Sequence, residues 1–154
     1  MEKTNVMRIL DAENIPYTPY EYDESITEGV VIAKILGENE ECVFKTLVTV
    51  GSDLKNYVFV IPVAEKLDLK KAAKAVGIKN VEMIKQKQLF PLTGYIHGGC
   101  SPIGMKKQFK TVIDETAIIV DKFFVSAGKV GKQVETSPLE IARLSGADFC
   151  DLVV

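Results

Sequence analysis

One stretch of the chain combines residue types that suit a ligand-binding loop. Residues 94–107 contain four glycines, a histidine, a Ser-Pro step and the closing pair Lys106 and Lys107. Glycine is entropically costly in helices and strands, and proline removes a backbone donor, so we expect a shaped loop. A turn at Gly98 and Gly99 would present N–H groups at close range beside two positive charges. The pattern fits an anionic or carbonyl-bearing ligand, and equally a structural turn with two solvated lysines.

The common catalytic constellations do not occur in this sequence. His97 is the only histidine, and residues 99–104 do not form the G-x-S-x-G pattern of a nucleophile elbow. A dyad of His97 and Cys100 is conceivable, but two residues three positions apart on a tight loop need not converge. One histidine and isolated thiols do not make a metal site, and no nucleotide-binding fingerprint is present. We therefore expect any chemistry to use backbone donors, lysine and water, without a metal or cofactor.

A charged residue interrupts the clearest strand pattern of the chain. Residues 42–50 form an apolar run rich in β-branched residues, typical of a strand buried on both faces, yet Lys45 lies in its middle. A buried, unpaired ammonium is strongly unfavourable, so Lys45 must extend to solvent, meet an anion or serve a function. Its neighbour Thr46 should point to the opposite face, because side chains alternate along a strand.

Charge is distributed unevenly, although the formal net charge is only −2. Residues 66–110 contain ten basic and two acidic residues, a balance of +8, whereas residues 1–41 contain ten acidic and three basic residues, a balance of −7. Such a dipolar pattern would orient a polyanion toward the basic segment. A weak or transient nucleic-acid partner fits the pattern, and so do the solvated faces of helices.

Length and periodicity predict one α+β domain over residues 1–154 with a mixed β-sheet flanked by helices. Helical spacing of apolar residues is found in residues 4–13, 27–36, 67–76 and 82–89. Thr4 is a candidate cap for the first of these helices, and a capping pattern begins a last helix at Ser137. Strand patterns are found in residues 17–22, 42–50, 57–63, 122–126, 132–135 and 149–153, and the strands at 42–50 and 57–63 are expected to form a hairpin. Residues 109–120 are expected to hold a strand and a turn of helix, with a break at Asp114. The helix at 27–36 is expected to be buried, and Pro19 makes 17–22 an edge strand.

Sequence features at the N-terminus and the cysteines indicate the compartment. The N-terminus does not resemble a signal peptide, and no apolar run approaches the ~18 residues needed to span a bilayer. Cys42, Cys100 and Cys150 are far apart and odd in number, so neither a disulfide framework nor a zinc site is indicated. We expect a cytoplasmic protein with reduced thiols.

Seven sequence blocks follow one another along the chain, namely residues 44–47 (Phe-Lys-Thr-Leu), 69–74, 94–95, 98–104, 106–107, 110–114 and 125–128. Together these blocks resemble the YbaK/EbsC family of freestanding trans-editing deacylases. They cover nearly the whole chain in order, which makes the set far more specific than any one block. The family is similar to the editing domain inserted in bacterial prolyl-tRNA synthetases. The resemblance implies an α+β fold with a strongly twisted, barrel-like sheet.

The resemblance also implies an activity and a site. The expected reaction is hydrolysis of the ester that joins a wrongly attached cysteine to the 3′ end of tRNA(Pro). Lys45 would contact the terminal adenosine and its phosphate, and the backbone of Gly98 and Gly99 would lie at the scissile ester. The other expected substrate-binding residues are Tyr22, Thr46, His97, Ser101 and Ser126. The family is thought to lack a protein nucleophile, because the thiol of the substrate can attack its own carbonyl.

The expected partners are the acceptor end of tRNA(Pro) and prolyl-tRNA synthetase. The lysines expected to follow the acceptor-stem phosphates are Lys70, Lys71, Lys74, Lys106 and Lys107. Glu28, His97 and Val130 depart from the residues usual in the family, so another small aminoacyl group such as alanine, attacked by water, is an alternative substrate. A module that binds tRNA or a synthetase without catalysis is the second alternative.

Overall fold

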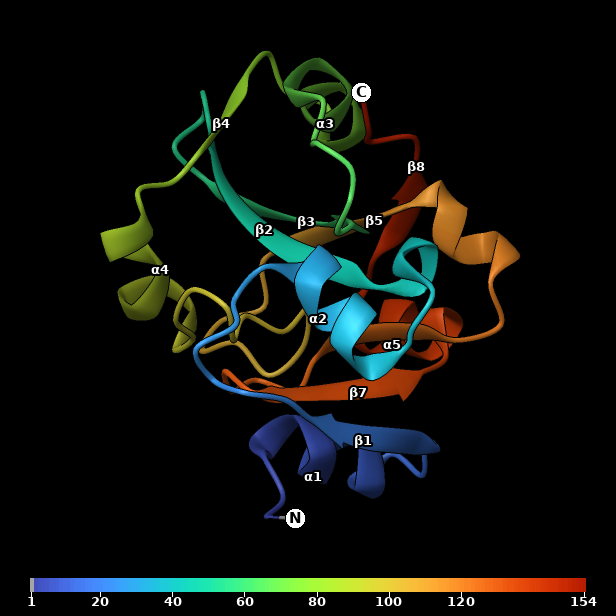
Figure 1. Ribbon diagram of the computed structural model, residues 1–154. Helices are drawn as coiled ribbons and strands as arrows, with labels where there is room; N and C mark the ends of the chain where they lie inside the picture. Colours follow the sequence, from blue (N-terminus) through green and yellow to red (C-terminus); the bar gives the residue numbers. More distant parts are fainter. Residues whose placement is uncertain (1) are drawn as a thin grey trace.

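Two β-sheets and five α-helices make up residues 2–154, the part of the chain that the computed structural model describes (Figure 1). The helices are α1 (Asn5–Ala12), α2 (Gly29–Leu36), α3 (Leu69–Val76), α4 (Gln86–Thr93) and α5 (Pro138–Ser145). The strands are β1 (Tyr17–Glu21), β2 (Phe44–Gly51), β3 (Asn56–Pro62), β4 (Val81–Met83), β5 (Lys110–Asp114), β6 (Phe123–Ser126), β7 (Lys132–Thr136) and β8 (Asp148–Cys150). Short 3-10 helices, η1 (Glu40–Cys42) and η2 (Glu115–Ile119), complete the fold. The α+β class expected from the sequence is confirmed.

The larger sheet has the strand order β4-β2-β3-β5-β8 and is mixed. β2 and β3 form an antiparallel hairpin, while β5 lies parallel to both β3 and β8. The hairpin follows from two apolar, β-branched runs joined by a short turn. β4 pairs with β2 only at residues 49–51, so the outer edge of β2 has no strand neighbour from Phe44 to Val48.

The smaller sheet has the order β1-β7-β6 and is antiparallel. β1 is an edge strand, as Pro19 predicted. A single bridge between Val43 and Phe124 links the two sheets. The strands of the described residues therefore do not close into a barrel.

Two large apolar cores, and a smaller cluster of Ala33, Val43 and Phe124, hold the layers together. The inter-sheet core joins both sheets with α1 and α5 through fully buried Leu10, Phe123 and Ile141, and Phe44 meets Phe123 edge to face with ring centroids 5.2 Å apart. The α3 core fills the opposite face of the larger sheet, where α3 covers β3 and β5. Each large side chain buried in this way contributes about 1.5–3 kcal/mol. The larger sheet thus separates α3 from the loop at residues 94–107.

Helix ends agree with the capping patterns of the sequence. The hydroxyl of Thr4 accepts a hydrogen bond from the Met7 N–H, and that of Ser137 accepts one from the Glu140 N–H. Pro138 occupies the first turn of α5. No helix within residues 2–154 has the length and apolar character needed to cross a membrane.

Two local predictions were wrong. Residues 82–89 are not one helix: β4 ends at Met83, and α4 begins at Gln86 and continues through Pro91. Residues 81–83 form a strand because they pair with the outer edge of β2, and local periodicity cannot predict such a long-range pairing. The helix expected to be buried, α2, is half-exposed, because only Ile32 and Ala33 are buried while Ile35 is 56% exposed.

Candidate active site

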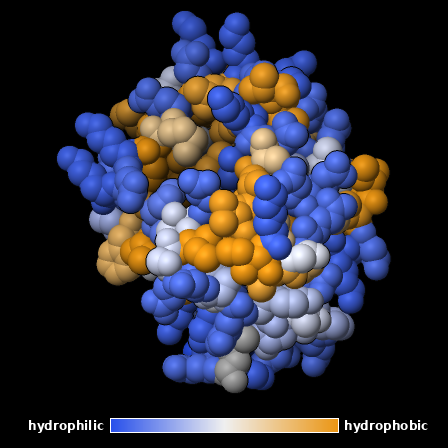
Figure 2. All heavy atoms as spheres, in the orientation of Figure 1, coloured by the Kyte–Doolittle hydropathy of each residue, from blue (hydrophilic) through white to orange (hydrophobic). Residues whose placement is uncertain are grey.

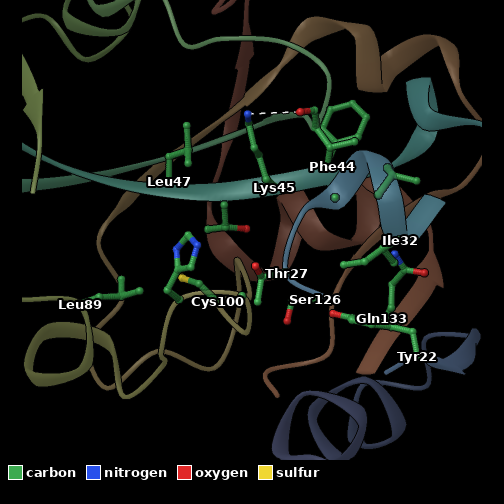
Figure 3. Close-up of a pocket in the computed structure, with 16 residues that line it drawn as sticks. Tyr22, Thr27, Ile32, Phe44, Lys45, Leu47, Leu89, Cys100, Ser126 and Gln133 are labelled. Atoms are coloured by element: carbon green, nitrogen blue, oxygen red, sulfur yellow. Dashed lines mark hydrogen bonds between the residues drawn. The ribbon is translucent and has the colours of Figure 1, made fainter. Parts of the chain in front are cut away.

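A cavity of about 180 Å³ lies where the free edge of β2 faces the glycine loop and the start of α2 (Figure 3). Segments distant in sequence line it. The lining residues are Tyr22, Thr27, Gly29, Ile32, Val43, Phe44, Lys45, Thr46, Leu47, Val63, Leu89, His97, Gly98, Cys100, Ser126 and Gln133. Six residues expected from the sequence therefore converge in one place, namely Tyr22, Lys45, Thr46, His97, Gly98 and Ser126.

The cavity extends around the edge of β2, so neighbouring residues on opposite faces of the strand both reach it. Lys45 lies opposite Ile61, which belongs to the α3 core, and Thr46 lies opposite Val60 of the inter-sheet core. Figure 3 shows Lys45 on one side of the strand and Ser126 on the other. An interior strand could not arrange its side chains in this way, because a neighbouring strand would separate the two faces.

Lys45 is half-buried at the cavity, and its ammonium is not neutralised by a salt bridge within the described residues. Its Nζ donates a hydrogen bond to the Val63 carbonyl oxygen at 3.3 Å. Burial lowers the pKa of Lys45 from its ordinary value, and the nearby Glu65 carboxylate opposes this shift. A partly dehydrated ammonium with one weak partner is well suited to bind an anion.

Thr46 provides an unsatisfied polar atom. Its Oγ1 is buried and has no hydrogen-bond partner among residues 2–154. Leaving a buried hydroxyl without a partner costs about 1–3 kcal/mol, so native structures rarely contain one outside a binding site. A polar ligand atom in the cavity would remove this cost.

The two glycines of the loop have different roles. Gly98 has a φ of +85°, a conformation that L side chains rarely adopt, and its N–H forms no hydrogen bond with the described residues. At Gly99, a Cβ would lie 2.9 Å from the Val130 nitrogen, and the Gly99 N–H already donates to the Ile96 carbonyl oxygen at 2.9 Å. Gly98 can therefore offer a backbone donor to a ligand, whereas Gly99 allows the loop to pack against the turn at Val130.

Polar side chains from β7 and from the segment before α2 complete the cavity. Burial raises the pKa of Tyr22, so its phenol stays protonated. The Gln133 amide lies against the Glu38 carboxylate, and with its nitrogen turned toward Glu38 it can donate to both carboxylate oxygens, at 2.6 and 3.1 Å. Burial raises the Glu38 pKa to about 7. Sequence reasoning missed Thr27 and Gln133, since neither belongs to a recognisable local motif and only the tertiary fold brings them to the cavity.

His97 and Cys100 both line the cavity, but they do not form a catalytic dyad. No hydrogen bond joins them. Burial raises the pKa of the Cys100 thiol to about 12, so the thiolate needed for nucleophilic attack is not formed near neutral pH. The thiol acts as an apolar wall, and His97 lies exposed at the mouth.

The remaining expected residues lie outside the cavity. Ser101 is fully buried, and its hydroxyl accepts a hydrogen bond from the Ile103 N–H at 3.4 Å. Lys106 and Lys107 end the glycine loop, which packs on the inter-sheet face of the larger sheet, whereas α3 covers the opposite face. In α3, Lys71 is already paired with Asp151 at 2.9 Å. Within residues 2–154, no group of three or more His, Cys, Asp or Glu side chains could hold a metal ion.

The profile of a known family, the aminoacyl-tRNA editing domain, matches residues 24–144. This range includes all the cavity residues except Tyr22. The chain belongs to the aminoacyl-tRNA editing domain family. The resemblance drawn from the sequence blocks is confirmed.

Relatives of this editing domain agree in sequence and in fold. A protein of Enterococcus faecalis, named as a candidate Cys-tRNA(Pro)/Cys-tRNA(Cys) deacylase EbsC, is 46% identical over 153 residues, which cover 98% of this chain and 93% of the relative. The crystal structure of a candidate trans-editing enzyme for prolyl-tRNA synthetase has a TM-score of 0.85 at 24% identity, covering 100% of this chain and 99% of that one. A hypothetical protein of known structure has a TM-score of 0.89 at 22% identity, covering 98% of this chain and all of that one. Both solved structures share the fold.

The editing-domain cavity offers positioning and electrostatic stabilisation. It contains an ammonium, a free backbone N–H and an unpartnered hydroxyl, but its only thiol is held protonated. Ser126 Oγ accepts a hydrogen bond from the Gly128 N–H at 3.1 Å, and no base bonds to it. The cavity therefore suits a substrate that supplies its own reactive group or is attacked by water.

Proposed function

We propose that this protein is a trans-editing deacylase that hydrolyses the ester of mischarged Cys-tRNA(Pro). The observation that carries the proposal is the convergence of Lys45, Thr46 and Gly98, each with an unused hydrogen-bonding capacity, in one small cavity. Membership of the editing family and the name of the Enterococcus faecalis relative support the reaction class. We treat residues 1–154 as a single editing domain that acts in the cytoplasm.

In this proposal, the cavity positions the aminoacyl ester. Lys45 binds the phosphate of the terminal adenosine, and the Gly98 N–H faces the ester carbonyl oxygen, where negative charge develops in the transition state. Thr46 Oγ1 gains a hydrogen bond from the substrate, which removes the cost of its unpartnered state. Tyr22 and Ser126 line the aminoacyl side of the cavity.

The nucleophile is the thiol of the substrate cysteine. A bond forms between the sulfur and the carbonyl carbon, the carbonyl–ribose oxygen bond breaks, and the ribose oxygen takes up the thiol proton. Water then opens the resulting cyclic thioester and releases cysteine. The protein contributes proximity and orientation, which can replace much of the entropic cost of a bimolecular step.

Small aminoacyl groups are the expected substrates. A synthetase pocket built for proline rejects similar-sized amino acids by only about 1–3 kcal/mol, so a second hydrolytic site is needed. We expect a cavity of about 180 Å³ to favour small aminoacyl groups over large ones. We expect prolyl-tRNA synthetase to deliver the mischarged tRNA, because the modest net charge of −2 favours weak binding of free tRNA.

The test is deacylation of tRNA(Pro) carrying radiolabelled cysteine, alanine or proline, with and without prolyl-tRNA synthetase. Cys-tRNA(Cys) is included because the name of the relative contains it. Rapid loss of cysteine alone is the expected result. Loss of alanine at a similar rate would identify water as the nucleophile, and loss of none of these groups would favour a binding module without catalysis.

A further inference from the structure

A long segment beside the cavity contains no acidic residue. Between Glu82 and Asp114 the sequence has five lysines and a histidine but no Asp or Glu. This segment forms α4, the glycine loop and most of β5, and it contributes Leu89 and His97 to the cavity. This segment therefore brings positive charge, and no carboxylate of its own, to the cavity mouth.

An exposed aromatic ring lies on this segment. Phe90, which follows Leu89 in α4, is 55% exposed, and the Lys106 ammonium lies 5.1 Å from the centre of its ring. A second pair repeats the arrangement, with the Lys107 ammonium 6.0 Å from the centre of the Phe109 ring. In Figure 2, apolar atoms reach the surface at the position of α4, next to hydrophilic side chains.

Local contacts hold Lys106 in place next to α4. The Lys106 N–H donates to the Thr93 carbonyl oxygen at the end of the helix, at 3.0 Å. The Lys106 side chain also passes close to Gly94, where an added Cβ would lie 3.3 Å from its Cγ. The aromatic ring and the ammonium are thus presented together rather than by two independent mobile chains.

Aromatic rings interleaved with lysines are the surface that single-stranded nucleic acids recognise. Bases stack on exposed rings while ammonium groups contact the phosphates. We propose that the unpaired 3′ strand of tRNA, next to the aminoacylated adenosine, lies across α4, with one base stacked on Phe90 and its phosphates near Lys87 and Lys106. The inference rests on the proposed function, which places the terminal adenosine in the adjoining cavity.

Other exposed apolar residues do not meet the same conditions. Ile119 in η2 is 85% exposed, but it is not aromatic, has no lysine partner and lines no part of the cavity. It therefore provides a matched control for the loss of an exposed apolar side chain.

The first experiment compares two substrates, cysteinyl-tRNA(Pro) and a cysteinyl ester of adenosine that lacks the rest of the strand. The variants are Phe90→Ala, Phe90→Tyr and, as a control, Ile119→Ala. We expect Phe90→Ala to lower kcat/KM on the tRNA substrate by about tenfold, mainly through KM, and to leave the adenosine ester unaffected. Phe90→Tyr should retain wild-type kinetics because it keeps the ring, and Ile119→Ala should behave as the wild type on both substrates.

The second measurement uses an RNA oligonucleotide with the 3′ end of tRNA, in which 2-aminopurine replaces the penultimate cytosine. Stacking on Phe90 should quench the fluorescence with wild-type protein but not with Phe90→Ala. Quenching without hydrolysis of either ester would refute the proposed function alone. Two results for Phe90→Ala would overturn the inference: unchanged kcat/KM on the tRNA substrate, or equal losses of kcat/KM on both substrates. A loss of kcat/KM seen only when prolyl-tRNA synthetase is present would also overturn it, because Phe90 would then belong to a protein-docking surface.

Discussion

α3 and α4 look alike in the sequence, since both are eight residues long and part of the same basic segment, yet the fold gives them different surroundings. α3 buries Ala72, Ala73 and Val76 against the larger sheet, and its Lys71 is bound by Asp151 and by the Val153 carbonyl oxygen. α4 buries only Thr93 and leaves Phe90 exposed beside the cavity. The comparison shows that charge along a segment predicts a possible partner but not which part of the segment meets it. That depends on the surface against which each helix packs.

The largest expected effect is on the ammonium at the cavity itself. Lys45→Ala should lower turnover of Cys-tRNA(Pro) by about 100-fold or more, because it removes a preorganised charge from a partly dehydrated site. Lys74→Ala, an exposed lysine of α3, is the control and should keep wild-type turnover. Single-turnover deacylation measures both. Wild-type turnover by Lys45→Ala would show that the active site lies elsewhere.

The next effect separates backbone geometry from chemistry. Gly98 and Gly77, the residue that ends α3, both have positive φ, so alanine at either should lower the free energy of unfolding by about 1 kcal/mol. Only Gly98→Ala should also lower kcat, by about tenfold or more, because its Cβ would meet Thr27 and shift the free N–H. Urea denaturation and deacylation kinetics give the two quantities. Equal loss of kcat in both variants would mean that activity follows stability alone.

A smaller effect tests the two groups of lysines directly. The double change Lys106→Glu and Lys107→Glu should raise KM for the aminoacyl-tRNA about tenfold and reduce the dependence of KM on salt, since each lost phosphate contact removes about 0.7–0.9 from the salt slope. The matched double change Lys70→Glu and Lys74→Glu in α3 makes the same change in net charge, but it lies on the opposite face of the larger sheet, so KM should change by less than about twofold. A larger effect in the α3 variant would place the acceptor stem on the opposite face of the sheet.

The smallest effect concerns the side chains of the glycine loop. His97→Ala and Cys100→Ala should each retain activity within about threefold, because the loop is expected to act through its backbone. With a thiol pKa of about 12, Cys100 should also contribute no ionisation to the pH–rate profile between pH 6 and about 9. Deacylation rates over this pH range provide the measurement. Complete loss of activity in either variant would restore the His97–Cys100 dyad.

Much of the fold could be predicted from local patterns. The helix caps at Thr4 and Ser137, the β2–β3 hairpin and the break at Asp114 follow from residue types at fixed spacing. β4 could not be predicted, because it pairs with an edge of β2 that lies more than thirty residues before it. Local periodicity carries no information about pairing between segments so far apart in sequence. The exposure of α2 likewise depends on what packs against it.

The candidate site divides in the same way. The sequence by itself determined which residues were unusual, because a lysine within an apolar strand and two adjacent glycines in a loop conflict with ordinary folding preferences wherever they lie. Only the tertiary structure decided that Lys45 and Thr46 both reach one cavity, since this requires a strand without an outer neighbour. It alone also brought Gln133 to the cavity and placed the lysines of α3 and of the glycine loop on opposite faces of the larger sheet, because these positions depend on packing between elements that are distant in sequence.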